Sequence, residues 1–225
     1  ETLQARMQRR STKRHPIPLI GIAWLCDRIC DALACAHEHA VVHRDLKPAN
    51  IMVNAPHRPP FVKVLDFGAA KALDGARFDP TTIGRVIGSI AYMTPEQMRQ
   101  RAVDGRTDQF ALAVILYELI TLRRAWATDE HGAPLAAHAS IGDANSQLDI
   151  MKRIIRGERP RASSVRDEVP TSVDEVLVRA MSVNPADRFQ DIATFRGAFR
   201  AAMLDAPELM PAWSPEDELE TGPFD

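Results

Sequence analysis

The stretch His43-Arg44-Asp45-Leu46-Lys47-Pro48-Ala49-Asn50 decides the fold class of this chain, and Asp66-Phe67-Gly68 follows it sixteen residues later. The first stretch fixes five residue types in the pattern His-Arg-Asp-Leu-x-x-x-Asn. At ordinary residue usage, such a match arises by chance in about one chain in 10⁴ of this length. Short apolar groups flank both stretches, so we expect each of them to lie in a loop beside a short strand.

Four side chains in these stretches supply the groups that phosphoryl transfer requires. The reaction needs a carboxylate that takes or orients a hydroxyl proton, a cation that steadies the transferred group, and oxygen ligands that hold Mg²⁺ against the phosphates. Asp45, Lys47, Asn50 and Asp66 are the candidates for these roles. The alternative is a pair of loop turns whose Asp and Asn side chains only stabilise the backbone, and the order and spacing of the motifs argue against it.

The composition is that of an ordinary globular chain, with 225 residues, a formal net charge of −2, 45% hydrophobic and 26% charged residues. The near-neutral balance argues against a nucleic-acid partner. The longest apolar run, Phe110–Tyr117, is far shorter than the roughly 20 residues that span a bilayer, and the polar start of the chain shows no signal peptide. Cys26, Cys30 and Cys35 lack disulfide or metal spacing, so we expect core thiols and a cytoplasmic location, with a membrane anchor possible only in a longer parent protein.

The apolar pattern predicts a mainly α chain with short β-strands. Apolar residues recur at three- and four-residue steps over 19–39, which predicts an amphipathic helix, and the stretch 107–122 is apolar on all sides, which predicts a buried one. Residues 206–225 contain six acidic and no basic residues, so we expect a disordered acidic tail. Further helices are expected at 146–156, 171–181 and 189–204, and short strands at 41–42, 51–53 and 62–65.

Residues 17–205 resemble the C-terminal lobe of a Ser/Thr protein kinase catalytic domain of the bacterial, eukaryotic-like type. The two opening motifs carry this resemblance, and the segments GSIAYMTPEQ (88–97) and NPADRF (184–189) add to it. It implies a catalytic loop at 43–50 and an activation segment at 66–96. It also implies ATP and Mg²⁺ as cofactors and proteins with Ser or Thr hydroxyls as substrates.

The resemblance assigns roles to the residues of the catalytic loop and its neighbours. Asp45 becomes the catalytic base, and Lys47 contacts the γ-phosphate, as in the Ser/Thr-specific form of this loop. Asn50 and Asp66 become the Mg²⁺ ligands. Met52 becomes the floor of the adenine pocket. His43, Phe67 and Gly68 take structural roles.

The resemblance also assigns structural and regulatory residues outside the catalytic loop. Ser89 is expected to contact the catalytic Asp and Lys. Glu96, in Thr94-Pro95-Glu96, is expected to form a buried ion pair with Arg188, and Asp108 to anchor the backbone of the catalytic loop. Arg44 implies regulation by the activation segment, because a phosphate there would pair with this arginine and order the loop. Thr81 and Thr82 are the candidate phosphate acceptors.

The sequence departs from the kinase pattern before the catalytic loop. A kinase also needs a Gly-rich loop, the Lys of a V-A-I-K strand and a Glu on the next helix, and residues 1–42 contain none of them. We therefore expect a C-terminal lobe without its N-terminal β lobe, in which residues 1–16 are the remnant that follows the interlobe hinge. The lobe face around Met52 and Phe67 should then be exposed and partly apolar, so the chain should aggregate or dimerise.

Three functions stay open at this point. The first is a Ser/Thr protein kinase truncated to its C-terminal lobe and inactive alone, with a separate N-lobe or a kinase as candidate partner. The second is a non-catalytic binding scaffold or pseudokinase fragment. A small-molecule phosphotransferase shares the Asp-x₄-Asn loop, but Lys47-Pro48 and Asp-Phe-Gly favour a protein kinase. Two other clusters receive packing or surface roles: His37 with His39, and the basic residues of 6–14.

Overall fold

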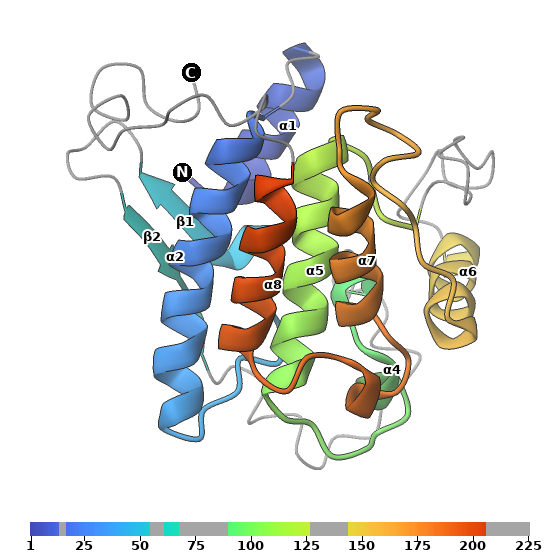
Figure 1. Ribbon diagram of the computed structural model, residues 1–225. Coiled ribbons are helices and arrows are strands. Elements are labelled where there is room, and N and C mark those ends of the chain that lie inside the picture. Colours follow the sequence, from blue (N-terminus) through green and yellow to red (C-terminus); the bar gives the residue numbers. More distant parts are fainter. Residues whose placement is uncertain (14–16, 55–60, 68–89, 127–143, 206–225) are drawn as a thin grey trace.

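The computed structural model describes residues 1–13, 17–54, 61–67, 90–126 and 144–205, and these residues form a mainly helical chain with a small sheet (Figure 1). The fold class predicted from the sequence is therefore confirmed. The helices are α1 (Leu3–Lys13), α2 (Leu19–Glu38), α4 (Pro95–Met98), α5 (Gly105–Thr121), α6 (Ala144–Arg156), α7 (Thr171–Ala180) and α8 (Ile192–Leu204). The strands are β1 (Ile51–Asn54) and β2 (Phe61–Val64), and the short 3₁₀ turns are η1 (Pro48–Asn50), η4 (Ile90–Tyr92) and η6 (Pro185–Asp187).

Helix α5 forms the centre of the molecule. Every residue from Thr107 to Thr121 is buried, and α2, α7 and α8 pack around this helix. The helix begins at Gly105, two residues before the predicted start, because Asp104 caps it by accepting a hydrogen bond from the backbone N–H of Arg106. Gly105 is required there, since a Cβ atom would lie 2.8 Å from the ring of His37.

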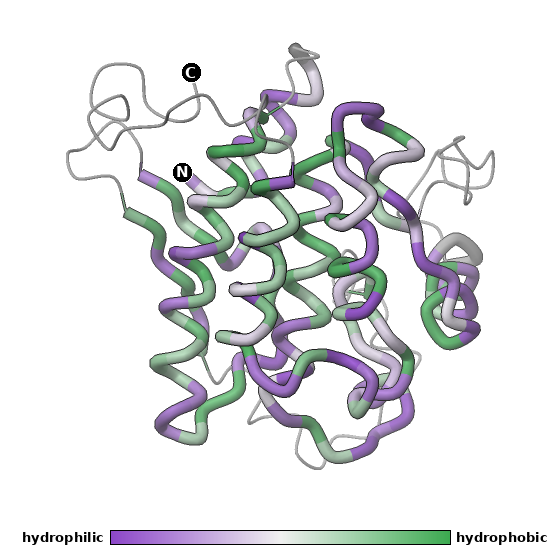
Figure 2. The backbone as a smooth tube through the Cα atoms, in the orientation of Figure 1, coloured by the Kyte–Doolittle hydropathy of each residue, from purple (hydrophilic) through white to green (hydrophobic). Residues whose placement is uncertain are grey.

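The amphipathic helix predicted for residues 19–39 is α2, which ends at Glu38. Figure 2 shows hydrophilic and apolar residues alternating along this helix, as one buried face requires. Cys26 and Cys30 lie on that face, with their sulfur atoms 3.9 Å apart. The prediction of a core thiol is wrong for Cys35, which is exposed because its position falls outside the buried stripe.

The strands β1 and β2 pair in antiparallel fashion, with Ile51 opposite Val64 and Asn54 opposite Phe61. Both strands match the predictions for 51–53 and 62–65. The strand predicted at Val41-Val42 is wrong, since these residues are not in a strand. The backbone N–H groups of the next two residues, His43 and Arg44, donate to the side chain of Asp108 on α5 and not to a neighbouring strand.

The C-terminal helices correspond to the predicted ones, but α6 begins two residues before its predicted start and α8 begins after it. Helix α8 begins at Ile192, three residues after the predicted start, because Asp191 caps it by accepting a hydrogen bond from the N–H of Thr194 at 2.7 Å. Phe189, the predicted first residue of this helix, lies before it. Its backbone N–H donates to the side chain of Gln109 on α5 at 3.1 Å, which fixes the turn that precedes α8.

Helix α1 packs against η1 and β1. Leu3 and Arg6 are buried in this contact, and Thr2 forms an isolated bridge with Met52. Helix α1 is therefore not fully solvated, because one side of it is part of the core. None of the described helices combines the length and the apolar character that crossing a bilayer requires.

Candidate active site

The catalytic-loop residues Asp45, Lys47 and Asn50 meet at one carboxylate. Lys47 Nζ lies 2.7 Å from Asp45 Oδ2. Asn50 Nδ2 donates to the backbone oxygen of Asp45 at 3.0 Å and lies 3.4 Å from Asp45 Oδ2. The turn η1, which starts at Pro48, brings Asn50 back toward Asp45 because proline suits the first position of a helical turn. Asp45 keeps more than a third of its side chain exposed, so it can reach an incoming hydroxyl group.

The backbone just before Asp45 is held by the buried carboxylate of Asp108. Its Oδ2 accepts a hydrogen bond from the N–H of His43 at 2.9 Å, and its Oδ1 accepts one from the N–H of Arg44 at 2.9 Å. Asp108 is 1% exposed, and hydrogen bonds to a buried charged acceptor are stronger than neutral ones. This carboxylate therefore sets the path by which the chain enters the catalytic loop.

Arg44 adopts the left-handed backbone region, with φ of 67°. This conformation disfavours a side chain that carries a Cβ atom by about 1–2 kcal/mol. The strain is held from both sides of the residue: Asp108 accepts its N–H, and Gln97 Nε2 of α4 donates to its carbonyl oxygen at 2.6 Å. Strained backbone held in this way is typical of functional sites.

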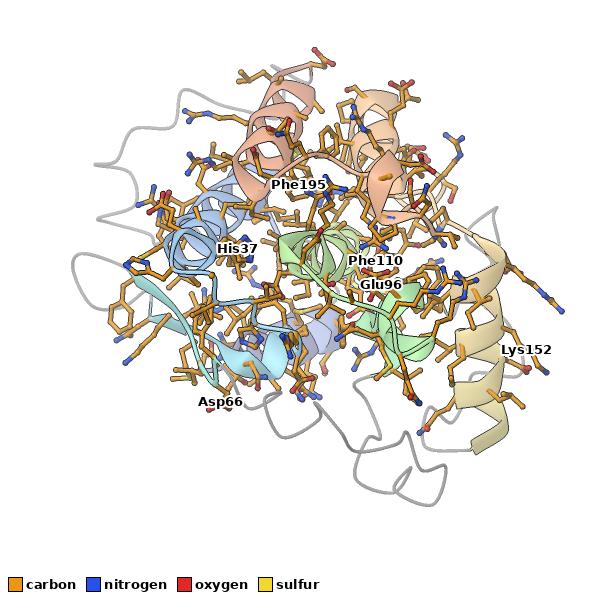
Figure 3. The ribbon with its side chains drawn as sticks, turned by 90° about the horizontal axis from the view of Figure 1, so that it is seen from below. His37, Asp66, Glu96, Phe110, Lys152 and Phe195 are labelled. Atoms are coloured by element: carbon orange, nitrogen blue, oxygen red, sulfur yellow. The ribbon has the colours of Figure 1, made fainter. Side chains whose placement is uncertain are left out.

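Asp66 follows a residue that is hydrogen-bonded to Asn50, because β2 pairs with the strand that follows the catalytic loop. The N–H of Leu65 donates to the carbonyl oxygen of Asn50 at 2.8 Å, which places Asp66 one residue further along. Asp66 is exposed and has φ of 60°, a conformation that Asp tolerates better than most residues. Figure 3 shows it at the edge of the molecule, beyond the sheet.

His43 joins the two motifs physically. Its Nε2 atom is 2.8 Å from the carbonyl oxygen of Leu65, and its ring meets the ring of Phe67 edge to face at a centroid distance of 4.9 Å. His43 is fully buried, whereas Phe67 is 37% exposed. The expected partly apolar face around Met52 and Phe67 is thus present at Phe67, and Met52 lies half-buried in β1.

Glu96 and Arg188 form a bidentate ion pair in the interior. Arg188 Nη1 donates to Glu96 Oε1 at 2.7 Å and Arg188 Nη2 to Glu96 Oε2 at 2.8 Å. Thr107 of α5 donates its hydroxyl to the same carboxylate at 3.2 Å. Arg188 also donates to the carbonyl oxygens of Ser182 and Arg106 and lies over the ring of Phe110. The pair therefore joins α4, α5 and the turn before α8.

Burial and the polar partners of Glu96 shift the pKa of this carboxyl group in opposite directions. Burial alone would raise the pKa, but the hydrogen bonds and the positive charge of Arg188 outweigh that effect and lower it below the ordinary value of 4.5. Glu96 is therefore ionised in the folded chain at neutral pH.

Two contacts at this site were missed by the sequence analysis. His37 Nε2 lies 2.8 Å from Asp108 Oδ2, so this histidine of α2 completes the set of partners around the carboxylate. Tyr92 of η4 donates its hydroxyl to the buried Glu118 of α5 at 2.7 Å, and Arg124 contacts both. Burial, together with the charge of Glu118, raises the pKa of Tyr92 well above its ordinary value. The only available signal for His37 was its spacing ahead of His43, which does not indicate a partner on α5.

Some of the predicted site residues lie outside the described residues: Gly68, Thr81, Thr82 and Ser89. Within the described ranges, no group of three or more His, Cys, Asp or Glu side chains could hold a metal ion by itself. Asn50 and Asp66, the Mg²⁺ ligands that the resemblance implied, are both among the described residues. An amide oxygen and a carboxylate suit Mg²⁺, which binds one or two protein ligands and takes the rest from water and phosphates.

Comparison with known proteins identifies the family. Residues 2–196 match the family described as the protein kinase domain. The chain belongs to the protein kinase family. It is 39% identical over 191 residues to the serine/threonine-protein kinase Pkn1 of Myxococcus xanthus, which covers 84% of this chain and 25% of that protein. It is 34% identical over 179 residues to the serine/threonine-protein kinase PknL of Mycobacterium tuberculosis, which covers 80% of this chain and 40% of that protein.

The fold is similar to that of solved kinase domains. The kinase domain of Mycobacterium tuberculosis PknI matches with a TM-score of 0.61 and 24% identity, over 89% of this chain and 62% of that one. The chain thus spans 25% and 40% of the two curated kinases named above. The kinase fold and the bacterial Ser/Thr kinase relatives expected from the sequence are confirmed.

The buried ion pair yields a double-mutant prediction. Glu96→Gln should lower the free energy of unfolding by about 3–5 kcal/mol, because it leaves the buried Arg188 without its counter-charge. Adding Arg188→Met to that variant should destabilise by less than the sum of the single changes, since the second change removes the orphaned charge. Urea denaturation at pH 7 measures all four proteins, and strictly additive effects would contradict the coupling.

The pKa of Glu96 gives a pH dependence with a definite sign. Because the folded pKa is lower than the unfolded one, the stabilisation from Glu96 is present above the ordinary value of 4.5 and is lost as the pH falls below it. The difference in free energy of unfolding between the unaltered chain and Glu96→Gln should therefore shrink below pH 4.5. Glu175→Gln, an exposed change on α7, is the control, and a difference that grows toward low pH would contradict the sign.

Proposed function

We propose that this chain is the C-terminal lobe of a Ser/Thr protein kinase, which transfers the γ-phosphoryl group of ATP to protein hydroxyls once an N-terminal lobe completes the nucleotide site. The observation that carries the proposal is the meeting of Lys47 and Asn50 at Asp45, with Nζ–Oδ2 at 2.7 Å and Nδ2–O at 3.0 Å. Family membership and the Ser/Thr kinase relatives support it.

The residues present fit a magnesium nucleotide by the chemistry of their donors. Asn50 uses its amide nitrogen toward Asp45, which leaves the amide oxygen as a ligand type that Mg²⁺ accepts. The exposed carboxylate of Asp66 is the second ligand. Lys47 supplies a cation beside the catalytic carboxylate. When bound, MgATP supplies the phosphoryl group and neutralises part of its charge.

The chain's own residues then position and deprotonate the acceptor. Asp45 Oδ2 accepts the proton of a Ser or Thr hydroxyl, and Lys47 Nζ, already 2.7 Å from that oxygen, holds the carboxylate in its orientation. Asn50 fixes the backbone of Asp45 through its carbonyl oxygen. Positioned proton transfer of this kind contributes about 10²–10⁴-fold in rate.

The proposal assigns the missing part of the site to another lobe. Residues 1–42 contain no Gly-rich loop and no V-A-I-K strand, and the side of the site at Phe67 is partly exposed. The chain as given should therefore bind MgATP weakly and transfer phosphate slowly. Its substrates, by this proposal, are proteins with Ser or Thr hydroxyls.

Phosphoryl transfer from MgATP to a generic Ser/Thr protein substrate tests the proposal. The chain should be assayed alone and joined at its start to the N-terminal lobe of a bacterial Ser/Thr kinase. The joined protein should be active, and Asp45→Asn should reduce its rate by about 10²–10⁴-fold. Asp149→Asn, a change at a half-exposed side chain on α6, is the matched control and should leave the rate unchanged.

Two results would contradict this account. A joined protein that binds MgATP but is no faster than its Asp45→Asn variant would favour the scaffold or pseudokinase function. Full activity of the chain alone would show that the C-terminal lobe needs no further lobe.

A further inference from the structure

Helix α1 is rich in basic residues. Residues 1–13 contain Arg6, Arg9, Arg10 and Lys13 but a single acidic residue, Glu1. Arg6 is buried, whereas half of the Arg9 side chain is exposed. The helix packs against η1, the turn that ends the catalytic loop.

Glu1 neutralises only part of this positive charge. Its carboxylate accepts hydrogen bonds from Arg6 Nε at 3.1 Å and from Arg9 Nη1 and Nη2 at 2.9 and 2.7 Å. Within the described part of the chain, Arg10 has no carboxylate at ion-pair distance. The pKa of Arg6 is lowered, first by burial and further by the charges of Arg9 and Arg10, although Glu1 opposes this. Helix α1 thus keeps a net positive charge.

A segment of the opposite charge follows α8. Residues 206–225 contain no basic residue and six acidic ones, Glu208, Glu216, Asp217, Glu218, Glu220 and Asp225. Because the whole chain has a net charge of only −2, this concentration of negative charge is a local feature. It matches the local excess of positive charge on α1.

The packing of α8 against α2 brings the origin of this segment toward α1. Arg196 of α8 contacts Asp31 of α2 at 2.5 Å, and Arg200 contacts Asp27 at 3.8 Å. Residue numbers rise along α8 as they fall along α2, so the two helices are antiparallel and α8 ends near the start of α2. Figure 1 shows the end of α8, the start of α2 and the end of α1 at the same end of the molecule.

We propose that the acidic segment 206–225 binds the basic face of α1 within the same chain. The segment has 20 residues, and a random-coil chain of that length has a root-mean-square end-to-end distance of about 25 Å. The tether raises the effective concentration to about the millimolar range. Exposed ion pairs are individually weak, but a segment attached to the same chain forms several of them at the same time.

Zero-length carbodiimide cross-linking of the full chain tests this contact, because it joins a lysine amine only to a carboxylate in contact with it. At low salt, carboxylates of 216–220 should be joined to Lys13 in preference to Lys152, an exposed lysine on α6 (Figure 3). The yield should fall in 1 M salt, where the Debye length drops to about 3 Å. A mixture of ¹⁴N- and ¹⁵N-labelled chains identifies links within one chain.

Charge reversal provides the matched variants. Arg9→Glu with Arg10→Glu should reduce the links to Lys13 by about fivefold, since two attractive pairs become repulsive. Arg101→Glu with Arg156→Glu makes the same charge change at exposed positions elsewhere and should leave the links unchanged. Circular dichroism confirms that each variant folds.

A second readout does not depend on the cross-link. Neutralising residues 216–218 and 220 as Gln or Asn should shift the backbone amide resonances of α1 in ¹⁵N NMR spectra and leave those of α6 in place. Equal links to Lys13 and Lys152 would overturn the proposal. So would links only between differently labelled chains, which indicate a second copy as partner, or α1 resonances that respond to anionic lipid vesicles but not to the neutralised segment.

Discussion

The buried carboxylate of Asp108 is the interaction on which the geometry of the catalytic loop depends. It accepts the N–H groups of His43 and Arg44 and contacts His37, so it joins α2, α5 and the loop at one point. Arg44 has φ of 67°. Without this positive φ, the chain would continue past Arg44 in the extended direction set by Val41 and Val42. With Arg44 turned in this way, Asp45 faces Lys47 and Asn50 across the loop.

Helix α5 anchors two segments that are distant in the sequence through two consecutive residues, Thr107 and Asp108. Asp108 holds the start of the catalytic loop, while Thr107 supports the Glu96–Arg188 pair at the end of the activation segment. Gln97, the residue after Glu96, donates to the carbonyl oxygen of Arg44. A displacement of α4 would therefore shift the backbone of the catalytic loop, because the side chain of Gln97 is hydrogen-bonded to the strained residue Arg44.

The sequence was sufficient for helices α2, α5, α6, α7 and α8, the two strands and the kinase fold, because each depends on a local pattern or a motif with fixed spacing, whereas the short helices α1 and α4 were not predicted. The structure also brings together residues that the kinase resemblance had paired, as with Glu96 and Arg188. The sequence could not indicate His37 as a partner of Asp108, since that contact joins residues 71 positions apart. The strand expected at Val41-Val42 failed for the same reason: apolar β-branched residues predicted it, but a side chain on α5 takes the following N–H groups.

Hydrogen exchange of the His43 and Arg44 backbone amides tests the central role of Asp108 most directly. Both amides should exchange slowly in the unaltered chain, as buried donors to a carboxylate do. In Asp108→Asn, their protection relative to the amides of α5 should fall by about tenfold or more, because a hydrogen bond to a charged acceptor is weakened or lost. Fast exchange in the unaltered chain, or protection that does not change in the variant, would contradict the account.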